Sequence, residues 1–171
     1  MPQRLLKPTM RIATLALLAS TTLAATVTLP ANADADFDYQ RFQTPSGNIL
    51  CMMLREHSWV DPARAGTGVA TCQVQDPVYP PPPREYTSPN GQTSTCYLAG
   101  WGSQIALTQG SPPYLSCLTG VLTTPPLSTL APGQTKSVGT LTCASEPPAI
   151  RCTDSSTGHF FRMSRDSYDL G

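Results

Sequence analysis

Along most of the chain beyond residue 38, short apolar stretches alternate with clusters of polar, glycine and proline residues. Alternation of apolar and polar positions is clearest at 104–109, where Ile105 and Leu107 are expected to face a core, as in a half-buried strand. The same kind of pattern predicts strands at 38–44, 49–54, 69–74, 94–98, 104–109, 114–121, 136–144, 149–154 and 159–164.

Turn-forming residues separate these predicted strands. The sequence TPSGN at 44–48 combines a proline with glycine and asparagine, which favour tight turns, and it predicts a β-hairpin. Phe42 and Ile49 are then expected to face the core from its two strands. A helix-capping Asp61, followed by proline and a later glycine, predicts one short helical turn at 61–66.

Two further segments have distinctive patterns. The alternation within 136–144 assigns Val138 to one face of a strand and both Leu141 and Cys143 to the opposite face. The run YPPPPR at 79–84 predicts a polyproline II segment, because consecutive prolines cannot donate hydrogen bonds to a sheet. We expect it to cross the surface between two halves of the fold.

Helix signals are nearly absent from a chain that contains 18 prolines and 12 glycines among 171 residues. We therefore predict an all-β fold: a small disulfide-stapled β-sandwich or barrel of about eight short antiparallel strands. The segment 34–171 has the size of one domain.

The first 33 residues have the features of a cleavable signal peptide. Three basic residues and no acidic residue precede an apolar run at 12–29, and Ala31 and Ala33 match the small-residue pattern before a cleavage site. We predict cleavage after Ala33, which leaves one secreted domain at 34–171. An uncleaved signal anchor is the alternative, because the run nearly reaches the length that spans a bilayer.

The charge balance narrows the classes of partner. The chain has 11 basic and 11 acidic residues, and the predicted leader contains three of the basic ones. The remaining 8 basic and 11 acidic residues give a formal net charge of −3, without a basic cluster. Nucleic acid and anionic membranes are therefore not expected partners, and no stable membrane insertion is expected after cleavage.

All six cysteines follow the predicted leader, which directs them to an oxidising compartment where thiols form disulfides. Their spacing favours pairing of consecutive cysteines, 51 with 72, 96 with 117, and 143 with 152. The predicted disulfide residues are Cys51, Cys72, Cys96, Cys117, Cys143 and Cys152.

The segment 142–165 gathers the most potentially reactive side chains. As a catalytic site, it would use His159 with Asp154 as a base and its orienting acid in a small secreted hydrolase. The favoured interpretation is a cross-strand disulfide followed by a turn, because no Gly-x-Ser-x-Gly nucleophile motif occurs. No catalytic residue, metal or other cofactor is predicted, since neither Cys-x2-Cys nor closely spaced histidines are present.

Four residues are candidates for ligand binding. Trp101 lies between two glycines, where it either packs in the core, which is favoured, or forms a stacking platform for a ligand. His57 and Trp59 share a loop, and binding residues concentrate on loops. His159 is the fourth candidate. A third and weaker functional hypothesis is a protease inhibitor that presents the proline loop at 79–86.

Three stretches carry a resemblance to known proteins: FQTPSGNILCMM at 42–53, CYLAGWGSQIAL at 96–107, and 130–170. Their most specific parts are Ser-Gly-Asn-Ile-x-Cys, a Cys-x8-Cys pair followed by Gly-His, and a late Ser-x-x-x-Tyr at Ser164 and Tyr168. The chain resembles a family of small secreted actinobacterial proteins, common in mycobacteria, whose domain has no assigned function. The resemblance implies a secreted, disulfide-stapled β domain and implies no reaction.

These observations together predict a secreted, non-catalytic binding or cell-envelope-associated protein. Its ligand is not identified by the sequence. A cell-wall component or an extracellular protein is the expected kind of partner.

Overall fold

The computed structural model describes residues 39–56, 62–88, 91–118 and 127–171. These residues form thirteen β-strands and one 3₁₀ turn, Pro62–Arg64, which confirms the helical turn predicted there. The predicted leader lies outside the described residues, as do His57 and Trp59. Within the described part of the chain, no helix has the length and apolar character needed to cross a membrane.

The strands follow the chain in simple order. They are β1 (Tyr39–Gln43), β2 (Ile49–Arg55), β3 (Gly68–Val74), β4 (Glu85–Thr87), β5 (Thr93–Thr95), β6 (Gln104–Thr108), β7 (Tyr114–Leu115), β8 (Ser128–Thr129), β9 (Thr135–Val138), β10 (Leu141–Glu146), β11 (Ala149–Asp154), β12 (Phe160–Met163) and β13 (Tyr168–Leu170).

Two sheets contain most of these strands. The first has the order β7-β6-β3-β2-β1-β8 and the second the order β13-β12-β11-β10-β9. All neighbours are antiparallel except β1 and β8, which run parallel. The hairpin predicted around 44–48 joins β1 to β2, and its turn closes with a 2.9 Å bond from Thr44 N to Ile49 O.

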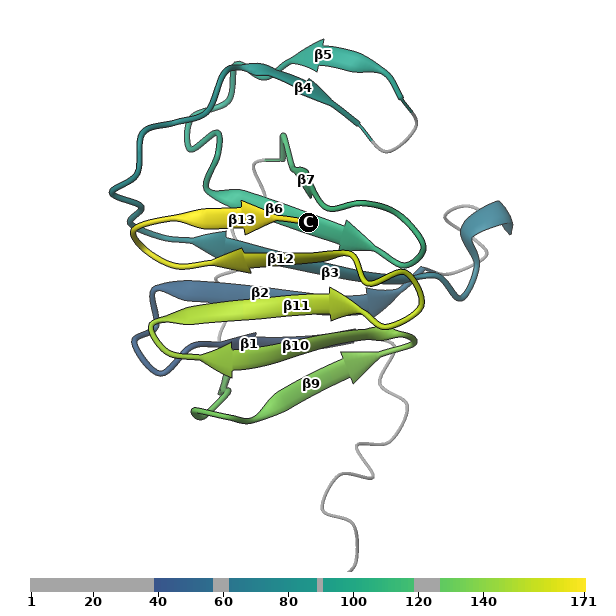
Figure 1. Cartoon of the computed structure of the whole chain (residues 1–171), viewed down its shortest axis with the longest axis vertical. Helices are drawn as coiled ribbons and strands as arrows, with labels where there is room; N and C mark the ends of the chain where they lie inside the picture. Colours follow the sequence, from purple (N-terminus) through teal and green to yellow (C-terminus); the bar gives the residue numbers. More distant parts are fainter. Residues whose placement is uncertain (1–38, 57–61, 89–90, 119–126) are drawn as a thin grey trace, which may run out of the picture. The chain divides into compact units, whose positions relative to one another are not determined.

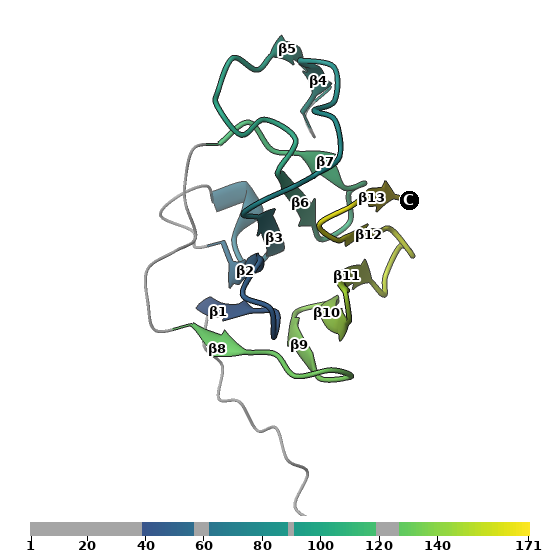
Figure 2. The same cartoon turned by 90° about the vertical axis from the view of Figure 1, so that its left-hand side faces the viewer.

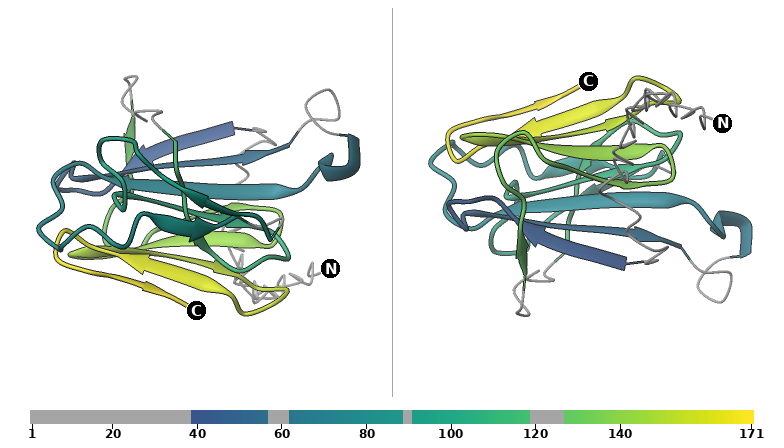
Figure 3. Two further views of the ribbon diagram at one scale, coloured as in Figure 1. Left: turned by 90° about the horizontal axis from the view of Figure 1, so that it is seen from above. Right: turned by 90° about the horizontal axis from the view of Figure 1, so that it is seen from below.

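The two sheets face each other as the layers of a β-sandwich (Figures 1 to 3). Their inner faces share one hydrophobic core, to which both sheets contribute fully buried side chains. The largest are Phe42, Ile49, Met53, Ile105, Leu107, Leu141, Ile150, Phe161 and Met163. Burial of each such side chain stabilises the fold by about 1.5–3 kcal/mol. The predicted all-β fold is confirmed, as is the inward orientation of Phe42, Ile49, Ile105 and Leu107.

The prediction of one strand at 136–144 is wrong. Gly139 has a positive φ of 57°, and it forms with Thr140 a two-residue turn that separates β9 from β10. Val138 therefore pairs directly with Leu141, and both side chains are buried on the same face. The predicted alternation assumed a continuous strand across 139–140. Because the chain reverses there, residues expected on opposite faces lie on the same face.

The extent of the remaining strands also differs from the prediction. The strand expected at 114–121 is reduced to β7, and residues 119–121 lie outside the described part. The pattern analysis missed β4, β8 and β13, each of which has only two or three residues. Such short strands have too few positions to show a period, and their pairing depends on neighbouring strands.

The three predicted disulfides are confirmed. Cys51–Cys72 joins β2 to β3, and Cys143–Cys152 joins β10 to β11, each between directly opposed residues of neighbouring strands. The Sγ atoms of Cys72 and Cys152 lie 3.9 Å apart, so the two disulfides meet across the sandwich.

The third disulfide, Cys96–Cys117, belongs to a different part of the domain. Cys96 follows β5, which forms a separate two-stranded sheet with β4. This small sheet lies beyond the edge of the sandwich where β6, β7 and β13 are found (Figures 1 and 2). The proline segment at 79–84 connects β3 to β4 without regular secondary structure.

Candidate functional site

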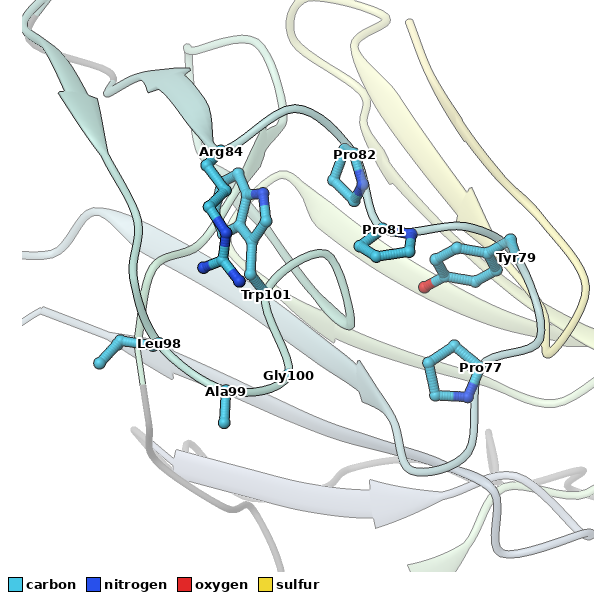
Figure 4. Close-up of a pocket in the computed structure, with 9 residues that line it drawn as sticks. All are labelled: Pro77, Tyr79, Pro81, Pro82, Arg84, Leu98, Ala99, Gly100 and Trp101. Carbon is cyan, nitrogen blue, oxygen red and sulfur yellow. The ribbon is translucent and has the colours of Figure 1, made fainter.

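A cavity of about 410 Å³ is lined by two segments of the chain. One wall is the segment 77–84, which includes the proline segment and leads into β4, and the other is the loop 98–101, which precedes β6 (Figure 4). We call this cavity the proline–tryptophan groove. Its volume is typical of small-ligand sites, which occupy about 300–1,000 Å³.

Three side chains tie the two walls together through bonds to backbone carbonyls. The Tyr79 hydroxyl donates to Gly102 O at 3.0 Å, and the Trp101 indole Nε1–H donates to Pro83 O at 3.0 Å. Arg84 Nη1 donates to Cys96 O at 2.9 Å, while Arg84 O accepts from Cys96 N at 2.8 Å. The Trp101 bond joins the two walls directly, and the other bonds tie the first wall to Gly102 and Cys96, on either side of the loop 98–101. The groove is therefore held by contacts within the protein.

Gly102 allows the two walls to approach closely. Its φ is 88°, a conformation that L-residues with a side chain rarely adopt. A Cβ atom at this position would lie 2.9 Å from Pro82 Cγ and closer still to Pro82 Cδ, well inside van der Waals contact. The Trp101–Gly102 sequence therefore serves both the turn and the contact with the proline segment.

The aromatic side chains at the groove are largely occupied by packing. Trp101 is only 7% exposed, and its ring lies 5.2 Å from that of Tyr86, tilted by 50°. Tyr79 contacts Tyr168 edge-on at 5.2 Å between ring centroids. Burial, and to a lesser degree Tyr168, raises the pKa of Tyr79 to about 12, so its hydroxyl keeps the proton that it donates.

Arg84 supplies the positive charge at the groove. The residue is exposed, and its guanidinium lies beside Trp101 in Figure 4. No carboxylate of the described residues forms an ion pair with it. Since only Nη1 bonds to another described residue, the remaining N–H donors of the guanidinium are available to a ligand.

The hydrolase hypothesis lacks support in the hydrogen bonds of Asp154. This carboxylate is fully buried and accepts bonds from Gly110 N at 2.7 Å, Thr140 Oγ1 at 2.6 Å, and Ser156 N and Oγ at 3.0 and 2.7 Å. Burial alone would raise the pKa of Asp154, but these bonds outweigh it and hold the pKa well below its usual range. Asp154 thus anchors a turn.

His159 has no side-chain partner among the described residues. Its backbone N–H donates to Thr157 Oγ1, and its carbonyl accepts from Asp154 N, but no bond joins its imidazole to Asp154. It also lines neither the groove nor the second described cavity. The structure therefore does not bring the proposed base together with its orienting acid or with a nucleophile.

The inhibitor hypothesis requires first that the 84–85 bond resist trypsin. Both the Arg84 carbonyl and its guanidinium are bonded to Cys96, and Glu85 begins the paired strand β4. A protease would have to break these contacts to accept the segment as an extended substrate. Inhibition of a protease stays a hypothesis.

Three core sulfur atoms approach one another closely enough to resemble a metal site. The Sγ atoms of Cys72, Cys143 and Cys152 lie within 4.8 Å of each other. All belong to disulfides, and a disulfide sulfur is not the thiolate that binds metals. The cluster is the point at which the two core disulfides meet.

A second cavity, of about 290 Å³, lies between the turn at 44–46 and the turn that joins β10 to β11. Its lining includes Ser145, whose side chain is buried and whose Oγ has no partner within the described part of the chain. The other lining residues are small or proline. This cavity contains no charged group.

Of the two candidate binding residues that the structure describes, Trp101 lines the groove and His159 does not. Trp101 is buried, which agrees with the favoured core-packing interpretation, and it also lines the cavity. His57 and Trp59 are outside the described residues. Sequence analysis did not identify Tyr79 and Arg84 as candidate ligand-binding residues. Their position on either side of four consecutive prolines was a usable signal, because such a rigid segment holds its flanking side chains in place.

Comparison with known proteins identifies no relative: no protein-family model, no curated protein and no solved structure matches this chain. The resemblance to secreted actinobacterial proteins consequently stays a prediction. The function must be inferred from the site itself.

Proposed function

We propose that this protein is an exported, non-catalytic binding domain that acts outside the cell or at its envelope, with its ligand in the proline–tryptophan groove. The leader-like sequence at 1–33 and the three disulfides support export, because disulfides persist in oxidising compartments. The predicted resemblance to a family of secreted actinobacterial proteins points in the same direction.

The observation that carries this proposal is the fixed geometry of the groove. Its walls are joined by side-chain bonds from Tyr79, Arg84 and Trp101. A site that is already formed avoids much of the entropy cost of ordering side chains on binding, so even a small cavity can bind usefully. A cation without an ionic partner among the described residues adds a means of recognition.

The test is a binding screen with the oxidised, ¹⁵N-labelled protein against cell-wall glycans, lipids and extracellular proteins. A ligand of the groove is expected to shift the NMR signals of the Trp101 indole N–H and the Gly102 amide. A Trp59→Phe variant assigns the two indole signals. The proposal fails if bound ligands shift other regions only, or if the protein turns over a substrate and loses that activity in His159→Ala.

A further inference from the structure

The groove has one charged side chain in its lining. Arg84 is that residue, and the rest of the lining is aliphatic, aromatic or glycine. Its free N–H groups form a planar fork that suits a carboxylate or a phosphate. A single cation balances the single charge of a carboxylate, whereas a phosphate dianion would retain a negative charge in a groove with no second described cation.

The walls on either side of Arg84 favour an aliphatic group. Pro77, Pro81 and Pro82 line one wall, and Leu98 and Ala99 line the other. A sugar ring is usually recognised by stacking on an open aromatic face, but Trp101 is 7% exposed and Tyr86 packs against it. The lining therefore suits an aliphatic side chain better than a carbohydrate.

The proline wall adds a third constraint. Prolines have no N–H group, so the backbone at 80–83 offers carbonyl acceptors and no donors. Pro83 O already accepts from Trp101 Nε1. A ligand that carries N–H donors next to a carboxylate matches this surface, and a peptide chain provides both.

We infer that the proline–tryptophan groove binds the carboxyl terminus of a peptide, with the terminal carboxylate on the Arg84 guanidinium and an aliphatic last side chain between the walls. The inference rests on the proposed function and specifies its ligand class. The peptide N–H groups donate to the carbonyls of the proline segment, and the cavity accommodates the last residues of the chain.

Paired peptides test the carboxylate directly. The probes are acetyl-Ala-Ala-Leu with a free carboxylate and the same peptide as a C-terminal carboxamide, titrated while the Trp101 indole signal is followed. The free acid is expected to bind about tenfold or more tightly than the carboxamide, because a charge-assisted pair is replaced by a neutral contact. High salt should weaken binding of the free acid and leave binding of the carboxamide nearly unchanged.

Substitution of the cation tests its location. Arg84→Gln is expected to weaken binding of the free acid about tenfold or more and to remove its advantage over the carboxamide. Arg84→Lys should give an intermediate loss, since it retains the charge without the fork. The matched control is Arg162→Gln, which removes a cation from β12 outside the groove lining. If Arg84→Gln does not fold, two other measurements test whether the carboxylate binds at Arg84: the affinity of Arg84→Lys and the salt dependence of binding to the native protein.

The outcomes separate this inference from the proposed function. Equal binding of acid and carboxamide, unchanged binding in the folded Arg84 variants, or no peptide binding at all overturns the carboxyl-terminus inference. If glucuronic acid or inorganic phosphate binds at Arg84 while the peptide does not, the inference also fails, although the groove stays a binding site. The proposed function fails when no ligand of the wider screen shifts the groove signals, or when a substrate is turned over and that activity is lost in His159→Ala.

Discussion

The sandwich and the groove end of this domain are held together by different forces. In the sandwich, opposing sheets bury large apolar side chains completely, and two disulfides lie in the core. At the groove end, all three residues of β5 are exposed, and Tyr97 and Leu118, which follow the half-cystines of the third disulfide, are 80% and 67% exposed. Order there depends on prolines, one crosslink and three side-chain bonds to backbone carbonyls.

This difference shows how a small domain can separate stability from recognition. The sandwich gains its free energy from burial, which leaves few of its side chains free to contact a ligand. The groove end has little to bury and is instead made rigid by covalent and hydrogen-bonded constraints. Arg84 consequently stays exposed while a bond to Cys96 O fixes its position.

The largest expected effect comes from removing each disulfide of a matched pair. Cys51–Cys72 and Cys96–Cys117 both span 21 residues, so their chain-entropy contributions are equal, about 3 kcal/mol each. Replacing both cysteines of the first bond by alanine should lower the global free energy of unfolding by that amount or more, because a core cavity is added. Urea denaturation measures this loss.

The matching double alanine variant of Cys96 and Cys117 should act mainly on the groove end. Amide hydrogen exchange is expected to accelerate more at 84–88 and 91–101 than in the strands of the sandwich, since the groove end can then open locally as well. Equal loss of protection in both regions would show that they unfold as one unit and would refute the comparison.

The second effect is a pH dependence confined to the sandwich. Because the pKa of Asp154 is lowered in the folded state, its ionised form stabilises the fold above the unfolded pKa of about 4, and this contribution disappears as the pH falls below it. We expect the free energy of unfolding of the native protein to fall by about 2 kcal/mol toward acid pH. Asp154→Asn should be less stable than the native protein at pH 6 and should lose little further stability as the pH falls.

Urea unfolding of both proteins at several pH values between 6 and 2 measures this contribution. The groove provides the internal control: Tyr79 has a pKa of about 12 and does not titrate in that range. Parallel pH profiles for the native protein and Asp154→Asn would contradict the assignment.

The smallest expected effect separates backbone strain from steric contact at the groove. Gly102 and Gly158 have φ values of 88° and 81°, but only at Gly102 would a Cβ meet a neighbour, Pro82. Alanine should cost about 1 kcal/mol at either position from the left-handed conformation, and about 1 kcal/mol more at Gly102 from displacement of Pro82. Urea denaturation compares the variants.

A local readout strengthens that comparison. Displacement of Pro82 should also disturb the adjacent bond from Trp101 Nε1 to Pro83 O, and the indole signal should move in Gly102→Ala only. An unchanged indole signal would mean that the walls adjust without losing their contact.

Sequence reasoning was most successful where local pattern and burial coincide. The inward orientation of Ile105 and Leu107 followed from a period of two, and the disulfides followed from spacing and compartment. It failed at Val138, because a glycine turn reversed the chain within an apparently continuous alternation. The groove was only partly predictable. Trp101 was a candidate binding residue from the sequence, whereas Arg84 became a candidate only from its position in the structure, where its guanidinium donates to Cys96 O.

The fold class, the strand-rich core and the crosslinks could all be predicted from the chain alone. Strand period, proline content and cysteine spacing are local signals, which can be recognised within short stretches of the sequence. Three features required the three-dimensional structure. These are the packing of the two sheets, the hydrogen bonds of Asp154 to a turn, and the contact between the proline segment and the loop of Trp101. Those contacts join residues far apart in sequence, and their energies depend on a geometry that no local pattern contains.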